Sequence, residues 1–247
     1  MPLTFVILFL AALWAGVQNA LAGGGSFITL PSLMLTGMDA RAANITSTIA
    51  LFPGQLATGW TGRKLVSGTA ELSFRSLVII SLVGGAIGAI LLLITPPSFF
   101  ARLVPWLVLF ATALFAWGSF APRRESAPKL GRTGSAIAQF CIAIYGGYFG
   151  GGIGFLMLAA LTAAHLAIRA AGATKNVLAG VMNASAVAIF VFSHEVRWPQ
   201  AVVASVGAII GGVLGGVMLQ KVNERALRVV VVLIGIALTI GLFLRRP

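Results

Sequence analysis

Ten apolar runs, separated by short polar or glycine-rich stretches, dominate the pattern along the chain. They lie at about 3–21, 26–37, 43–61, 76–94, 103–121, 134–150, 153–167, 173–193, 199–219 and 227–244. Eight of them are close to the ~20 residues that a helix needs to span a bilayer. The other two, 26–37 and 153–167, are shorter, and each directly follows a cluster of glycines. The pattern predicts an all-α integral membrane protein.

The two halves of the chain resemble each other. A shift of 128 residues aligns nine identical pairs over one continuous register: Gly23, Gly24, Phe27, Leu30, Leu33, Arg41, Ala42, Ala43 and Thr46 with Gly151, Gly152, Phe155, Leu158, Leu161, Arg169, Ala170, Ala171 and Thr174. Gln55 falls on Asn183, its shorter amide analogue. We therefore predict two membrane repeats, 1–120 and 135–247, joined by a polar cytoplasmic linker at 121–134.

The distribution of basic residues favours inverted repeats over parallel ones. If each glycine cluster separates two arms, each half has five arms and the second half is inverted. Twelve of the 17 Lys and Arg residues then fall on the linker side, against ten if each cluster only kinks one helix. Cytoplasmic loops carry the excess of positive charge. We therefore predict ten arms, with both termini outside the cell and Arg41 and Arg197 among the outer residues.

The glycine clusters predict broken helices inside the membrane. A 12-residue arm rises only ~18 Å, well short of the ~30 Å hydrocarbon core. The breaks at Gly23–Gly25 and Gly150–Gly152 should therefore lie toward the membrane interior, where irregular backbone is tolerated only in protein or beside a wet cavity. Matching interrupted segments indicate a transporter binding site, and free amides around Ser26–Phe27 and Ile153–Gly154 would favour an anion. Close helix packing is the alternative, and we favour it for "GGAIG" (84–88) and "GGVLG" (211–215).

Composition supports a membrane protein and excludes other classes. Hydrophobic residues make up 59% of the chain, charged residues 9%, and the mean hydropathy is +1.02. The net charge of +12 is scattered between apolar runs, which does not indicate a nucleic-acid partner. The single cysteine, Cys141, and two separated histidines provide neither a nucleophile with its base nor a metal-ligand set. We expect no enzyme, no cofactor and no metal.

The segments around the breaks resemble a known family. "AGGGSFITLPSLML" followed by "ARAANITSTIA", and later "YFGGGIGFLMLAAL" and "RAAGATKNVLAGVMNAS", are similar to the TauE/SafE family of bacterial membrane proteins, over nearly the whole chain. The resemblance implies two inverted repeats in the cytoplasmic membrane. It also implies export of small sulfur-containing anions such as sulfite or organosulfonates. One departure is Pro31, whose counterpart in the second half is Ala159.

Polar residues on the third arm of each half complete the candidate site. Gln55 and Asn183 lie about 18 and 15 Å along their helices, where an amide either binds substrate or ties helices together. Lys175 either reaches inward or extends to the headgroups, and Tyr148 either lines the site or anchors the interface. The candidate substrate-binding residues are Gly24, Gly25, Ser26, Gln55, Tyr148, Gly151, Gly152, Lys175, Asn176 and Asn183.

The acidic residues bear on the driving force. All five, Asp39, Glu71, Glu125, Glu195 and Glu224, fall in expected loops or helix edges, whereas proton-coupled carriers keep ionisable groups inside the bundle. An inside-negative potential would drive anions outward without a coupling ion, although sodium held by backbone carbonyls stays open. We expect alternating-access export, with a passive anion channel or a carrier of another small organic anion as alternatives. The lipid bilayer and a small anion are the expected partners, and a homodimer is also open.

Overall fold

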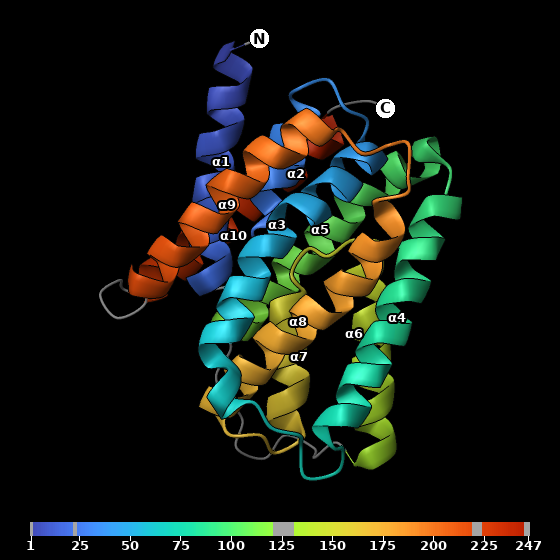
Figure 1. Cartoon of the computed structure of the whole chain (residues 1–247), viewed down its shortest axis with the longest axis vertical. Coiled ribbons are helices and arrows are strands. Elements are labelled where there is room, and N and C mark those ends of the chain that lie inside the picture. The colour runs from blue at the N-terminus through green and yellow to red at the C-terminus, as the bar shows by residue number, and fades with distance from the viewer. Residues whose placement is uncertain (1, 22–23, 121–130, 219–223, 245–247) are drawn as a thin grey trace.

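The computed structural model describes residues 2–21, 24–120, 131–218 and 224–244, and the regular elements of this part are all helices (Figure 1). The first half contains α1 (Pro2–Leu21), α2 (Ser26–Met34), α3 (Ala40–Gly62), the short 3₁₀ helix η1 (Arg63–Leu65), α4 (Phe74–Ile94) and α5 (Pro97–Phe120). The second half contains α6 (Arg132–Tyr148), α7 (Ile153–Ala163), α8 (Ile168–Phe190), α9 (Trp198–Met218) and α10 (Glu224–Leu244). The all-helical prediction is confirmed, and each apolar run corresponds to one α-helix.

Several helices begin before their apolar runs, because polar side chains cap their first turns. The Asp39 carboxylate accepts hydrogen bonds from the backbone amides of Arg41 and Ala42, so α3 starts three residues before its run at 43. The Ser73 hydroxyl caps α4 in the same way. These side chains satisfy amides that have no partner within the helix. Residues 121–130 of the expected linker lie outside the described residues, and α6 already begins at Arg132.

Length and apolarity separate the helices into two groups. Within the described residues, five helices are long and apolar enough to cross a membrane, and they lie in α1, α4, α5, α8 and α9. The two helices that follow the breaks are much shorter, nine residues for α2 and eleven for α7. At 1.5 Å per residue, neither can span the bilayer alone. The protein is therefore a multi-pass membrane protein that also contains two short helices at matching positions.

The helices pack in pairs that correspond between the halves. The longest contacts join α1 to α9 and α4 to α6, and α3 packs on α9 as α4 packs on α8 (Figure 1). Exchanging the two halves converts the α1–α9 pair into the α4–α6 pair, and the α3–α9 pair into the α4–α8 pair. The remaining large contacts, α3 with α8 and α5 with α10, join equivalent helices to each other. This pattern supports a duplicated structure whose halves exchange partners around the α3–α8 crossing.

The two GxxxG motifs are packing devices. A side-chain carbon added at Gly84 or Gly88 of α4 would overlap atoms of α6, including the carbonyl oxygen of Ile144. One added at Gly211 or Gly215 of α9 would overlap the backbone of α1. Glycine at these positions lets the helix backbones approach closely. The packing interpretation of "GGAIG" and "GGVLG" is confirmed, and it accounts for the two tightest helix pairs.

Equivalent threonines bind loops at opposite ends of the molecule. The Thr46 hydroxyl accepts a hydrogen bond from the Arg197 amide (3.3 Å), and the Thr174 hydroxyl accepts one from the Ser67 amide (3.1 Å). The loop between α8 and α9 lies at the end that carries both chain termini, whereas the loop after η1 lies at the other end (Figure 1). This arrangement supports the inverted ten-arm topology.

Cysteine labelling tests this topology. We expect a cysteine at His194, in the α8–α9 loop, and one at Ala70, before α4, to react from opposite sides of the membrane. Both positions are exposed, and the background carries Cys141→Ala because the native cysteine is also exposed. The measurement is accessibility to an impermeant maleimide in intact cells and in inverted vesicles. Eight-span parallel repeats would place both positions on the same side, so labelling from one side contradicts inversion.

Candidate functional site

The two glycine breaks share a left-handed glycine at equivalent positions. Gly24 has φ +83° and Gly152 has φ +75°, and the two positions are 128 residues apart. Both values fall in the left-handed region that side chains other than glycine rarely adopt. Gly152 caps α7 directly, whereas Gly24 lies two residues before α2, whose cap is Gly25. The prediction of matching breaks before α2 and α7 is therefore confirmed in the described backbone.

The amides after the breaks are less free than the sequence suggested. The Phe27 amide donates to the Gly24 carbonyl (3.0 Å), and the Phe155 amide donates to the Gly152 carbonyl (3.2 Å). The expectation of a free amide at Phe27 is wrong, because the chain makes a tight turn at the start of α2. No hydrogen bond to the described chain occupies the amides of Ser26, Ile153 and Gly154.

Different helices support the two breaks. Gln18 of α1 is buried, and its Nε2 donates to the Gly24 carbonyl (3.1 Å), while Gly25 lies against the Ala15 carbonyl of the same helix. In the second half, Gly152 lies against Ala111 of α5, and Gly151 lies beside the Phe149 ring. The sequence analysis missed Gln18, because a lone glutamine in an apolar helix gives no signal of the backbone group that it will bind.

The candidate amides Gln55 and Asn183 are brought together. Asn183 Nδ2 of α8 donates to Gln55 Oε1 of α3 over 2.6 Å. Asn183 is only 3% exposed and Gln55 is half-buried, so the bond is part-buried between the two helices. Because the two residues occupy equivalent positions, exchanging the halves maps the pair onto itself. The Gln55–Asn183 pair therefore lies where the two repeats meet, and it does tie α3 to α8.

The other candidates lie at different places. Lys175 is half-buried on α8, without an ion pair among the described residues. The Asn176 carbonyl lies near Gly59 of α3. The Tyr148 hydroxyl reaches Thr95 Oγ1 (3.4 Å) and its carbonyl accepts from Asn44 Nδ2 (3.1 Å). Tyr148 thus joins the end of α6 to the first half, through groups on α3 and at the end of α4.

One ion pair that the sequence analysis did not anticipate connects the halves. Arg41, at the start of α3, forms a salt bridge with Glu195 in the α8–α9 loop. The same guanidinium donates to the carbonyls of Leu93 and Thr95 at the end of α4. The position equivalent to Glu195 is Ser67, which cannot pair with Arg169 as a carboxylate would. Among the described contacts, a salt bridge therefore joins the halves at one end of the molecule, whereas hydrogen bonds between neutral groups join them at the other.

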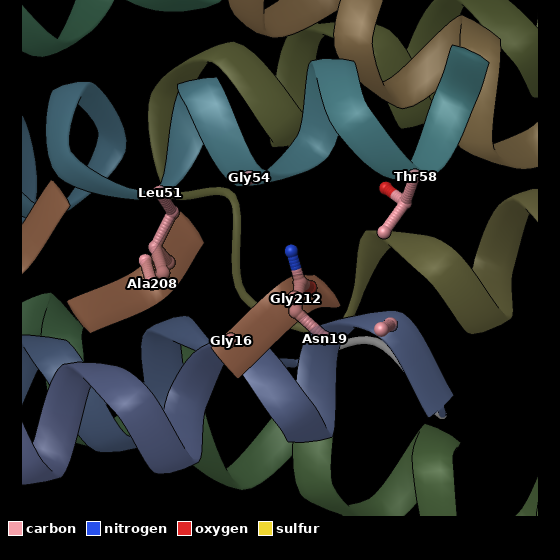
Figure 2. A pocket seen from close by; sticks show the side chains of 8 residues that line it. Gly16, Asn19, Leu51, Gly54, Thr58, Ala208 and Gly212 are labelled. Atoms are coloured by element: carbon pink, nitrogen blue, oxygen red, sulfur yellow. The ribbon is translucent and has the colours of Figure 1, made fainter. Parts of the chain in front are cut away.

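A small crevice opens beside the α3 helix. It is too narrow to enclose a water molecule, and it is lined by Gly16, Asn19, Ala20, Leu51, Gly54, Thr58, Ala208 and Gly212. Figure 2 shows the Asn19 side chain pointing from α1 toward α3 across this gap. Glycines on α1, α3 and α9 form much of the wall, so the crevice lies where these three helices approach one another.

Comparison with known proteins agrees with this architecture. Residues 8–242 match the family described as "Sulfite exporter TauE/SafE". A "Probable membrane transporter protein" of Haemophilus influenzae is 28% identical over 240 residues, which cover 94% of this chain and 92% of that protein. The "Probable membrane transporter protein YfcA" of Escherichia coli K12 is 26% identical over 239 residues, or 95% of this chain and 87% of that protein. A "Probable membrane transporter protein ORF9" of a Sinorhizobium species is 28% identical over 242 residues, or 95% and 90%.

The match spans both halves, including the two breaks and the amide pair between them. Relatives of similar length carry transporter names, and the family is one of transporters and not of enzymes. The expectation that the chain is not an enzyme is confirmed on this ground. The chain belongs to the sulfite exporter TauE/SafE family and is a multi-pass membrane transporter.

Proposed function

We propose that this transporter exports a small sulfur-containing anion, such as sulfite or an organosulfonate like sulfoacetate, across the bacterial cytoplasmic membrane. The observation that carries the proposal is the Gln55–Asn183 pair, a part-buried polar contact between the repeats of a chain that belongs to the sulfite exporter family. An amide NH₂ group donates hydrogen bonds, which oxyanions accept. A neutral donor at this depth binds an anion without presenting a fixed charge that would retain it.

The substrate site is built around this pair. Gln55 and Asn183 contact the anion, and Gly24, Gly25, Ser26, Gly151 and Gly152 are the further proposed contacts. The N-termini of α2 and α7 carry partial positive charge that favours an anion. Lys175 and Asn176, at the start of α8, attract the anion as it approaches the pair. Tyr148, which ends α6 just before the second break, also contributes to the substrate site.

The proposed mechanism is alternating access, which the way the repeats are joined supports. The α3–α8 crossing acts as the pivot, and the anion meets alternate sides of the membrane as one repeat rocks against the other. In the described structure the Arg41–Glu195 salt bridge and the Asn44–Tyr148 hydrogen bond hold the repeats together at one end. We assign this end to the outside, so the structure corresponds to an outward-closed state. Opening this end requires these contacts to break. The Arg41–Glu195 salt bridge is partly exposed to water, so it can break and re-form.

The surrounding bilayer fits the distribution of apolar surface. Large apolar side chains are exposed along the helices at the rim of the bundle, for example Ile79 on α4, Trp106 on α5, Val213 on α9 and Leu233 on α10. Such a surface is unfavourable in water and favourable against lipid tails. We infer contact with the lipids of the bacterial inner membrane over these faces. The same apolar faces would also fit contact with a second copy of the chain.

Membrane potential is the proposed driving force. Among the described acidic residues, Asp39 caps α3, Glu71 and Glu195 lie in loops, and Glu224 is the first residue of α10, so none is placed as a proton carrier inside the bundle. We expect efflux of sulfite from liposomes to rise as their interior is made more negative, by ~2.3 kcal/mol of driving force per charge per 100 mV. Potassium gradients with valinomycin set the voltage, and protein-free liposomes are the control. Flux that ignores voltage and follows an imposed pH gradient would contradict potential-driven export.

A further inference from the structure

The Gln55–Asn183 hydrogen bond leaves the oxygen of one amide and the NH₂ group of the other outside the pair. Asn183 uses its NH₂ group on Gln55, so its own Oδ1 is left over, and this atom is buried without a partner in the described part of the chain. Gln55 uses its oxygen, so its NH₂ group is left over. Reversing the assignment of oxygen and nitrogen in both amides exchanges the roles of the two residues, but again leaves one oxygen and one NH₂ group outside the pair. This conclusion therefore does not depend on how the amides are oriented.

Space is present beside the pair. Gly180 lies on α8 three residues before Asn183, which places it on the same face of the helix. It is buried, yet a carbon added to it would meet only Leu56 Cδ2 of α3, at 4.0 Å. Most buried glycines of this protein would instead meet backbone atoms at much shorter distance. The missing side chain at Gly180 thus leaves room between α3 and α8 next to the two unused groups.

A ligand that satisfies both groups must carry an acceptor and a donor. A fully ionised sulfonate has only acceptor oxygens, so it would accept from the Gln55 NH₂ group and leave Asn183 Oδ1 unpaired. It would also bring an oxyanion near the negative end of that carbonyl dipole. A buried acceptor without a partner costs free energy. An oxyanion that retains one hydroxyl group donates to Asn183 Oδ1 and accepts from Gln55, so it satisfies the pair completely.

We propose that the Gln55–Asn183 pair selects a singly protonated oxyanion, of which hydrogen sulfite in its hydroxyl form is the example, over fully ionised sulfonates. This inference rests on the proposed function and narrows its substrate class. Sulfite exchanges between this form and the doubly charged ion near neutral pH, whereas a sulfonate stays ionised throughout. The two anions therefore respond differently to pH at the same site.

The first test compares two anions on the purified full-length protein. Ligand-induced stabilisation in detergent is measured with sodium sulfite and with sodium methanesulfonate, at a mildly acidic and a mildly alkaline pH. We expect the apparent Kd for total sulfite to rise about tenfold for each unit of pH above the sulfite pKa, following the protonated fraction. Methanesulfonate should bind at least about tenfold more weakly than sulfite at the acidic pH, with no such dependence.

Methanesulfonate also reports any titration of the protein itself. The described helical elements packed around the pair carry these ionisable side chains: Arg41 on α3, Arg63 and Lys64 on η1, Arg75 on α4, Arg102 on α5, Arg132, Cys141, Tyr145 and Tyr148 on α6, and Arg169 and Lys175 on α8. If one of them governed binding, both anions would follow the same pH dependence. That result would overturn the proposal.

A second test locates the effect with matched double variants. Gln55→Leu with Asn183→Leu removes both partners, a change that is often neutral for stability, and we expect it to abolish sulfite binding. The control is Gln139→Leu with Ser81→Ala. It removes another buried side-chain hydrogen bond, from Gln139 Nε2 to Ser81 Oγ (2.8 Å), which likewise leaves the oxygen of its amide, Gln139 Oε1, without a partner among the described residues. It should retain pH-dependent sulfite binding.

The outcomes separate this inference from the proposed function. Equal binding of methanesulfonate and sulfite, or sulfite binding that does not change with pH, would overturn the selection of a protonated anion while export of sulfur anions stands. Sulfite binding that persists unchanged in the Gln55–Asn183 double variant would likewise overturn it. Failure of both anions to bind or to be transported by the native protein would reject the proposed function itself, and the inference with it.

Discussion

Leucine at Gly88 is expected to abolish correctly folded protein. Gly88 lies in α4 against α6, where an added carbon would overlap the Ile144 carbonyl oxygen and lie 2.7 Å from the Tyr148 amide nitrogen. These are backbone atoms, so the two helices must separate. Overpacking of this kind costs about 1–3 kcal/mol and more where the backbone cannot shift. The loss should appear as aggregated material in size-exclusion chromatography and as a lowered Tm in detergent.

The second repeat and an open position provide the controls. Gly215→Leu in α9 should have a similar effect, because an added carbon there would lie 2.8 Å from the Val17 carbonyl oxygen of α1. Gly241→Leu in α10 should be tolerated, since nothing lies within 4 Å of an added carbon and the residue is exposed. A Gly88→Leu protein that melts at the native temperature would contradict the close packing of α4 on α6.

The Gln55–Asn183 pair should show strong coupling in a double-mutant cycle. Gln55→Leu alone leaves the buried Asn183 amide without a partner, and Asn183→Leu alone removes the partner of Gln55. We expect each single change to destabilise the protein by about 1–3 kcal/mol. The double change should recover most of that loss, giving a coupling free energy of about 0.5–3 kcal/mol. Melting of the four proteins in the same detergent measures it, and additive losses would show that the two amides do not interact.

The helices and breaks could be predicted because their signals are local. Apolar runs identified every α-helix, and consecutive glycines marked the positions where α2 and α7 begin. Gly24 and Gly152 take left-handed backbone at the predicted breaks. Boundaries were less accurate, since α5 begins at Pro97 although its run begins at 103. Caps and proline at a first helical turn extend a helix beyond its apolar stretch.

The contacts of the site could not be predicted, because they depend on how helices cross. The repeat register identified Gln55 and Asn183 as equivalent, but equivalence alone does not bring two residues into contact. They meet because α3 and α8 cross at that depth. Similarly, Arg41 and Glu195 were both placed outside, yet their salt bridge requires the α8–α9 loop to reach the start of α3. Arg41 and Arg169 are identical in the repeat alignment, but the different partners available to them make the two ends unlike.

Counterflow of sulfite in proteoliposomes tests the central claim most directly. Liposomes loaded with unlabelled sulfite and diluted into radiolabelled sulfite should transiently accumulate label, because a carrier exchanges substrate across an alternating site. The Gln55→Leu/Asn183→Leu protein, which the account expects to be folded, should show no accumulation, whereas the Gln139→Leu/Ser81→Ala protein should match the native one. Accumulation that is equal in the Gln55–Asn183 double variant, or simple equilibration without any overshoot in the native protein, would contradict a carrier whose site is this amide pair.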